Sequence, residues 1–172
     1  EKALAENPRE DHRHGIVHCQ ITRADQLEKI AKMHLHVYAQ SIFLDYDNHI
    51  VEERVGKELA STSYSWKTLM SNGTDCPVEL PDALACMQCA VTRTTLRDHV
   101  GPYLPDQKFT VQEALDSYTI RSAEASFEEN VKGQIAEGMM ADFVVLGQNP
   151  FEVDESTIKD VPVCRTYLAG EL

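Results

Sequence analysis

The stretch Gly15-Ile16-Val17-His18-Cys19 decides the expected fold, because a short apolar run between polar segments is typical of a buried strand. Thr22 then opens an amphipathic helix, and a second strand is expected within 35–44. Helices are expected over 50–60 and 81–95. This alternation of strands and helices predicts an α/β fold with parallel strands.

The last part of the chain has a different pattern. A capping box at Thr110 and Glu113 opens a helix that runs through Tyr118. A short helix is expected after it over 122–129, and short strands over 133–137, 142–146 and 163–168. These strands are too closely spaced for crossover helices, so they are expected to form a separate small antiparallel layer.

Charge and composition limit the partners of the 172-residue chain. Its formal net charge of −12 argues against nucleic acid and against an anionic membrane surface. No apolar run approaches the ~20 residues of a membrane-spanning helix. The cysteine count is odd, which favours free thiols in a reducing cytosol and hence a cytoplasmic location. Cys86 and Cys89 have C-x-x-C spacing but no partner pair, which favours packing in a buried helix over zinc binding.

Several histidines could take part in chemistry. His18 ends a predicted strand, where parallel barrels carry their functional groups, so it is either a metal ligand or a core histidine bonded to backbone. The pair His34 and His36 also has metal-ligand spacing, but it stands at the start of a strand, which is the wrong rim. A similar pair, His12 and His14, falls in a charged and exposed segment. Both pairs are therefore weak candidates.

The segment Asn72-Gly73-Thr74-Asp75-Cys76-Pro77 presents a carboxylate on a stiff turn, because Pro77 restricts both itself and the preceding residue. Asp75 could act as a metal ligand or general base. Alternatively, it could close a turn or cap the next helix. Phosphate-binding loops and the serine-hydrolase elbow are absent from the sequence, which leaves metal-assisted or carboxylate chemistry.

Taken together, segments in order along nearly the whole chain resemble the metal-dependent amidohydrolases, and most closely the N-substituted formamide deformylase-like enzymes. The matching segments are Arg13–Gln20 ("R-H-x-I-x-H-x-Q"), Gln40, Tyr64–Trp66 ("Y-x-W"), Gly73–Val78 ("G-[ST]-D-x-P-V"), Ala90–Arg93 ("A-V-x-R"), Thr110–Thr119 ("T-x-x-E-A-L-x-x-Y-T") and Gly133–Leu146 ("G-x-I-x-x-G-x-x-A-D-F-V-V-L").

The resemblance implies the carboxyl-terminal part of a (β/α)₈ barrel, with strands six to eight in residues 1–130, and β-sandwich strands in residues 131–172. It implies a divalent metal, expected to be zinc, with His18 and Asp75 as ligands. Asp75 would also be the catalytic residue, taking a proton from the attacking water and passing it to the leaving nitrogen. The expected substrate is a small-molecule amide, cleaved at a non-peptide C–N bond such as an N-formyl group.

The departures from the family pattern matter equally. The family's first H-x-H, its bridging Lys or Glu and a further histidine have no counterpart here, so an incomplete and inactive fragment is expected, with open barrel edges that favour self-association. An alternative is a non-catalytic or regulatory domain of the same fold, and a further one is a small metal binder using His34 and His36. Only Ser71 and Asn72 stand where the family has a buried strand before Gly73, so either the strand is deleted or residues are missing there. Missing residues are favoured, because deleting a central barrel strand would expose its neighbours.

Overall fold

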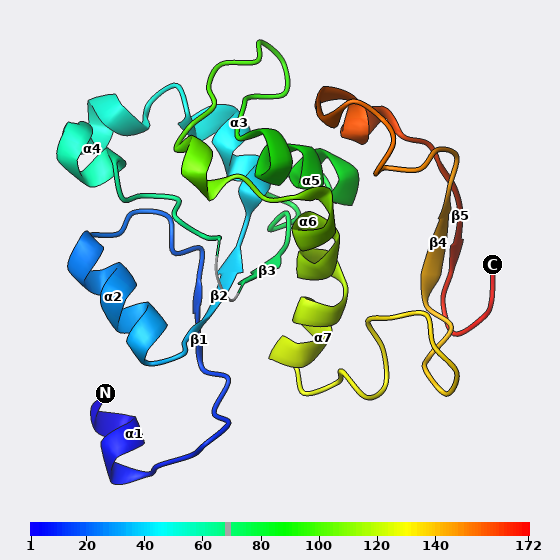
Figure 1. Ribbon diagram of the computed structural model, residues 1–172, viewed down its shortest axis with the longest axis horizontal. Helices are drawn as coiled ribbons and strands as arrows, with labels where there is room; N and C mark the ends of the chain where they lie inside the picture. Colours follow the sequence, from blue (N-terminus) through cyan, green and yellow to red (C-terminus); the bar gives the residue numbers. More distant parts are fainter. Residues whose placement is uncertain (68–69) are drawn as a thin grey trace.

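The computed structural model describes residues 1–67 and 70–172 (Figure 1). Its strands are β1 (Gly15–Val17), β2 (His36–Ala39), β3 (Met70–Asn72), β4 (Phe143–Leu146) and β5 (Val163–Tyr167). Its α-helices are α1 (Lys2–Glu6), α2 (Ala24–Lys32), α3 (Leu44–Asp47), α4 (Val51–Ala60), α5 (Ala83–Thr92), α6 (Val111–Tyr118) and α7 (Ile120–Ala125). Three short 3₁₀ helices are η1 (Ser41–Phe43), η2 (Pro105–Gln107) and η3 (Glu155–Asp160). Across the described ranges, no helix combines the length and the apolar character that crossing a bilayer requires.

The three amino-terminal strands form one parallel sheet in the order β1-β2-β3. Ile16 pairs with Val37, and Val37 in turn pairs with Met70. The crossover from β1 to β2 contains α2, and the crossover from β2 to β3 contains η1, α3 and α4, so the predicted α/β fold with parallel strands is confirmed. In Figure 1, α2 and α4 lie on one side of the sheet, and α5, α6 and α7 lie on the other.

The sheet remains open within the described residues. It has three strands and does not close into a barrel, so a barrel formed with further strands stays a prediction. The second strand is also shorter than expected, because the chain turns into η1 and α3 after Ala39. The helix predicted over 50–60 is present as α4, with a break at Gly56, where φ is 79°.

Strand β3 supplies a short strand before Gly73, because Met70–Asn72 pairs with β2, while the expectation that residues are missing there stays a prediction. All three of its residues are buried, and its polar side chains have polar partners. Ser71 Oγ lies 2.8 Å from His36 Nε2, and Asn72 Nδ2 donates to Ser41 Oγ at 3.0 Å. Hydrogen bonds to β2 and η1 therefore satisfy these buried polar side chains. For the preceding stretch 61–70 the sequence favours a turn or a helix, and positions 68–69 of it lie outside the described residues.

Helix α5 lies in the centre of the core, and its nine residues from Leu84 to Thr92 are all buried. The carboxylate of Asp82 caps it by accepting from the backbone N–H of Ala85 at 2.9 Å. Cys86 and Cys89 are both buried free thiols, which confirms that the C-x-x-C pair packs inside a helix. The capping box at Thr110 is also confirmed, because its hydroxyl accepts from the backbone N–H of Glu113 and the Glu113 carboxylate accepts from the Thr110 N–H.

At the carboxyl terminus, β4 and β5 form a two-stranded antiparallel ribbon with Phe143 stacked on Tyr167. The prediction of a strand over 133–137 is wrong, because these residues form irregular chain with bends and a turn. The described residues of this region contribute one ribbon, and a sandwich stays a prediction.

The 3₁₀ helix η3 packs against α5: Ile158 is fully buried, and the Lys159 N–H donates to Gln88 Oε1 at 2.9 Å. The main core therefore extends beyond the predicted boundary after residue 130.

Candidate functional site

The candidate site lies at the carboxyl edge of the parallel sheet, where all three strands end. His18 follows β1, Gln40 follows β2, and the turn with Asp75 follows β3. The backbone N–H of His18 donates to the Tyr38 carbonyl at 2.8 Å, and the N–H of Gly73 donates to the Ala39 carbonyl at 3.0 Å. The sheet ladder therefore continues into the site and brings His18 and the turn to one edge, as functional groups are placed in α/β sheets.

The imidazole of His18 is half-buried and held by Gln40. His18 Nδ1 lies 2.7 Å from Gln40 Oε1, and Gln40 Nε2 donates to the Tyr38 carbonyl at 3.3 Å. Because the second bond uses the amide nitrogen, the amide oxygen faces His18, and Nδ1 must be the nitrogen that donates. The Nε2 atom then keeps its lone pair, which is the form of histidine that binds metals.

His18 is not a core histidine bonded only to backbone, because its Nδ1 partner is a side chain. The backbone of His18 has a φ of 68°, which is the left-handed conformation, so the extended strand β1 ends at the residue before it. The Phe43 ring stacks beside its imidazole, with the ring centroids 6.1 Å apart. These contacts fix the ring at the end of the strand.

Asp75 is exposed on the turn that follows β3, with a left-handed φ of 57°. Its backbone carbonyl, and not its carboxylate, closes the turn by accepting from the Val78 N–H at 2.8 Å. The cap of α5 is supplied by Asp82. The structure therefore assigns the capping role to another residue. The role of Asp75 as ligand and proton carrier stays a prediction, as does the role of His18.

Two residues behind the site were missed by sequence reasoning. Ser41 and Asn72 are buried and hydrogen-bonded to each other across the ends of β2 and β3. The thiol of Cys86 adds contacts of 3.3 Å to Asn72 Oδ1 and to the Gly73 carbonyl. No local sequence signal distinguishes them, because a Ser and an Asn near a turn are ordinary turn residues.

A second hydrogen-bonded group lies in the loops that follow β1 and β2. The Tyr64 hydroxyl donates to Asp47 Oδ2 at 2.7 Å, and Gln20 Nε2 donates to the same oxygen at 3.2 Å. Burial, together with the neighbouring Asp47 carboxylate, raises the pKa of Tyr64 above its usual value. Trp66 packs edge-on against the Tyr64 ring and donates its indole N–H to the Cys19 carbonyl at 2.9 Å. The tyrosine therefore stays protonated and ties the loops together.

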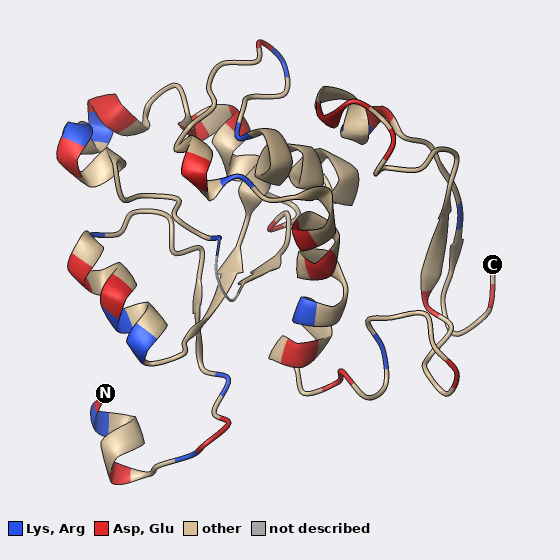
Figure 2. Cartoon of the chain, in the orientation of Figure 1, with Lys and Arg blue, Asp and Glu red and all other residues tan. Residues whose placement is uncertain are grey.

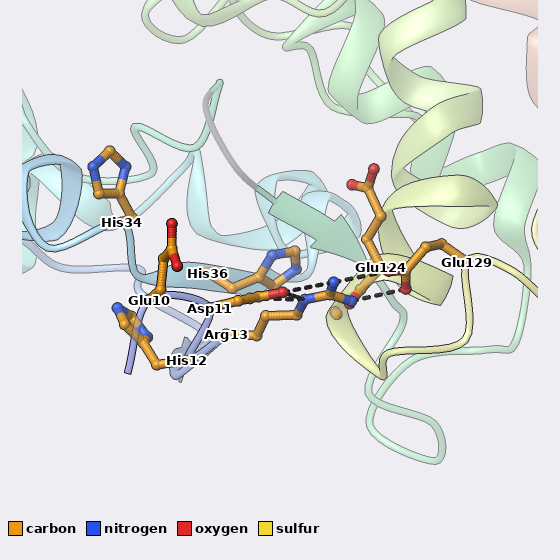
Figure 3. Close-up of a pocket in the computed structure, with 9 residues that line it drawn as sticks. Glu10, Asp11, His12, Arg13, His34, His36, Glu124 and Glu129 are labelled. Carbon is orange, nitrogen blue, oxygen red and sulfur yellow. Dashed lines mark hydrogen bonds and ion pairs between the residues drawn. The ribbon is translucent and has the colours of Figure 1, made fainter. Parts of the chain in front are cut away.

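Three of the other histidines, His12, His34 and His36, line a cavity of about 310 Å³ at the opposite, amino edge of the sheet (Figure 3). His12 uses both ring nitrogens locally: Nε2 lies 3.0 Å from the Met33 carbonyl, and Nδ1 accepts from the His14 N–H. Burial lowers the pKa of His36, whose Nε2 faces Ser71. Among residues 1–67 and 70–172, no group of three His, Cys, Asp or Glu side chains is arranged to hold a metal. His36 begins β2, so the pair His34 and His36 lies at the amino rim as predicted, and the metal binding of either pair stays untested.

Charge is distributed unevenly over the elements. Figure 2 shows acidic residues on helices such as α2, α4 and α6, while β1, β2 and β3 contain no Lys, Arg, Asp or Glu. One charged residue, Arg93, is buried, and its guanidinium donates to the carbonyls of Tyr103 and Tyr64. Burial lowers its pKa to about 10. It lies over the Trp66 ring and holds core loops together.

Comparison with known proteins identifies the class. The amidohydrolase family profile matches residues 1–172, so the chain belongs to the amidohydrolase family. The Bacillus subtilis protein YtcJ, named as an amidohydrolase, is 33% identical over 99% of this chain and 34% of its own length. The N-substituted formamide deformylase of Arthrobacter pascens is 35% identical over 58% of this chain and 17% of its own length.

A solved structure supports the same assignment. An uncharacterized metal-dependent hydrolase from Pyrococcus horikoshii superimposes with a TM-score of 0.72 at 29% identity, covering 83% of this chain and 30% of that one. The chain spans about a third of the length of YtcJ, and a smaller share of the deformylase. The family is thus established for these residues, and the resemblance inferred from the motifs is confirmed.

Proposed function

We propose that these residues form the carboxyl-terminal part of a metal-dependent hydrolase that cleaves non-peptide C–N bonds in small-molecule amides. The observation that carries the proposal is that one edge of the sheet holds both the His18 imidazole and the exposed Asp75 carboxylate. The Nε2 atom of His18, with its lone pair, points away from Gln40. An imidazole and a carboxylate are donors that a divalent cation such as zinc accepts. The solved relative named as a metal-dependent hydrolase supports the same class.

The chain's own residues have distinct roles in this proposal. His18 would hold the cation through Nε2, while Gln40 keeps Nδ1 protonated. A bound cation polarises the amide carbonyl and lowers the pKa of water. Asp75 takes the proton from the attacking water and delivers it to the leaving nitrogen. A structural zinc site usually has four protein ligands and a catalytic one three, so the remaining ligands would come from chain outside these residues.

The substrate class is argued from the relatives. One relative is named for action on N-substituted formamides, so an N-formyl group is the first candidate, and other N-acyl groups follow. A non-catalytic domain of the same fold is the second candidate, because the described residues offer two proposed ligands, His18 and Asp75, and no group of three.

The experiment uses the full-length protein with N-substituted formamides and N-acyl amides, and it follows the amine released. We expect Asp75→Asn to reduce turnover by at least about 100-fold, within the range that a positioned general base supplies. Metal content, measured by elemental analysis, should stay close to that of the wild type, because Asn keeps a side-chain oxygen at this position and His18 and the ligands from outside these residues are unchanged.

The matched control is Asp106→Asn, which removes an exposed carboxylate from η2, and it should retain wild-type turnover. A loss smaller than about tenfold in Asp75→Asn would contradict the role of Asp75 as proton carrier. A wild-type protein that binds no metal and turns over none of the amides would favour the non-catalytic domain.

A further inference from the structure

Ser41 and Asn72 form a reciprocal pair of hydrogen bonds behind the candidate site. The Ser41 backbone N–H donates to Asn72 Oδ1 at 3.0 Å, and Asn72 Nδ2 donates to Ser41 Oγ at 3.0 Å. The two residues are 1% and 8% exposed. Because water is excluded, breaking either bond leaves a buried polar group without a partner, so the pair has a strong preference for this one geometry.

The pair joins the two halves of the site. Ser41 directly follows Gln40, the residue that orients the His18 imidazole. Asn72 is the last residue of β3 and leads through Gly73 to the turn that presents Asp75. A shift of Ser41 would move Gln40, and a shift of Asn72 would move the turn.

The backbone ladder does not replace this link. The last backbone hydrogen bond of this ladder joins the N–H of Gly73, directly after β3, to the carbonyl of Ala39, the last residue of β2. Beyond Ala39 the chain leaves the sheet and enters η1, which begins at Ser41. From there, the loop after β2 is held to the end of β3 by the side chain of Asn72. The Cys86 thiol supports that side chain from α5, at 3.3 Å from Asn72 Oδ1.

We propose that Ser41 and Asn72 are positioning residues that fix the imidazole of His18 relative to the carboxylate of Asp75. The expected change in kcat rests on the proposed function. The expected change in the tautomer of His18 does not depend on it. Neither residue touches the reacting atoms. Misplacing reactive groups by about 1 Å can cost about 100-fold in rate, so a modest displacement is enough to be measured.

The test compares Ser41→Ala with Ser117→Ala. Both changes remove one buried hydroxyl, but the Ser117 hydroxyl donates to the Ala114 carbonyl within its own helix α6. For Ser41→Ala we expect kcat to fall about tenfold or more, with KM within about twofold, because orientation and not substrate binding is affected. Ser117→Ala should leave both constants unchanged.

A second readout does not need turnover. In the metal-free protein, long-range ¹H–¹⁵N spectra of the imidazoles, assigned with His18→Gln, report which nitrogen of His18 carries the proton. The wild type and Ser117→Ala should show the Nδ1–H form. Ser41→Ala should show exchange between the two tautomers, because the loop that carries Gln40 loses one of its two bonds to Asn72 and holds the amide less firmly against His18.

Wild-type kcat, or an unchanged His18 spectrum, in folded Ser41→Ala would overturn the proposal. If Ser41→Ala does not fold, Cys86→Ala removes the thiol contacts to Asn72 and Gly73 and should change both readouts in the same direction. No change in either readout there overturns the proposal as well. If the wild type turns over none of the amides, the proposed function fails, and the His18 spectrum alone decides the positioning role.

Discussion

The amide oxygen of Gln40 lies 2.7 Å from Nδ1 of His18, at the point where β1 and β2 end side by side. The amide nitrogen of Gln40 is occupied by the Tyr38 carbonyl, which fixes the direction of the amide. One buried glutamine thereby selects the protonated nitrogen of His18 and leaves the other nitrogen as the donor.

We expect Gln40→Ala to weaken metal binding by the full-length protein about 10- to 100-fold, the usual effect of removing a partner that orients a metal-binding histidine. Zinc titration by calorimetry measures it. Gln112→Ala is the control, because Gln112 contacts only Asp116 on the exposed face of α6 among its side-chain partners in the described residues. Equal affinities in the two variants would show that Gln40 does not orient a ligand.

The ion pair between Arg13 and Glu129 predicts a dependence of stability on pH. The Arg13 guanidinium donates to both oxygens of Glu129 at 2.8 Å, as Figure 3 shows, and lowers the pKa of Glu129 to about 2 from its usual 4.5. A lowered pKa stabilises the fold above pH 4.5, and this contribution is lost as the pH falls from 4.5 toward 2. Arg13 also contacts the Phe127 ring, at 4.0 Å from its centroid.

Urea midpoints at pH 7, 4.5 and 3 would test this. The midpoint of Glu129→Gln should lie below that of the wild type at pH 7, and the difference should shrink as the pH falls. Glu137→Gln removes an exposed carboxylate and should show no such trend. A constant difference across the three pH values would exclude the ion pair as its cause.

The capping box of α6 predicts a loss of stability in Thr110→Ala. The Thr110 hydroxyl accepts from the Glu113 N–H at 3.1 Å, and the Glu113 carboxylate accepts from the Thr110 N–H at 2.7 Å. Removing the hydroxyl should lower the free energy of unfolding by about 1 kcal/mol. Chemical denaturation measures this, and Thr110→Ser, which keeps the hydroxyl, should stay within about 0.5 kcal/mol of the wild type.

The five free cysteines should divide into two classes of reactivity. Cys76 and Cys164 are exposed, whereas Cys19, Cys86 and Cys89 are buried. Burial raises the pKa of Cys86 to about 11, and the thiolate is the reactive form. A disulfide reagent should modify two thiols in the native chain and five after unfolding, counted by absorbance. The substitution Cys76→Ser should reduce the native count to one, and rapid reaction of a third thiol in the native wild type would contradict the burial of Cys19, Cys86 and Cys89.

The sequence by itself determined the class of fold and the family. Alternating segments predicted the parallel sheet, because the apolar run before His18 and the helix-spaced residues after it are local signals of a strand and a helix. The capping box at Thr110 was predicted for the same reason, since its bonds join residues three positions apart. The two site candidates, His18 and Asp75, followed from their motifs, and their chemical roles stay predictions.

Only the tertiary structure decided how the strand before Asp75 is built and which residues support the site. Ser71 and Asn72 looked too polar and too few for a strand, yet their partners are His36 and Ser41, about thirty residues earlier in the chain. The tautomer of His18 likewise depends on Gln40, which stands on the next strand. Such bonds join residues that are distant in sequence, and local patterns report only the conformations that neighbouring residues favour.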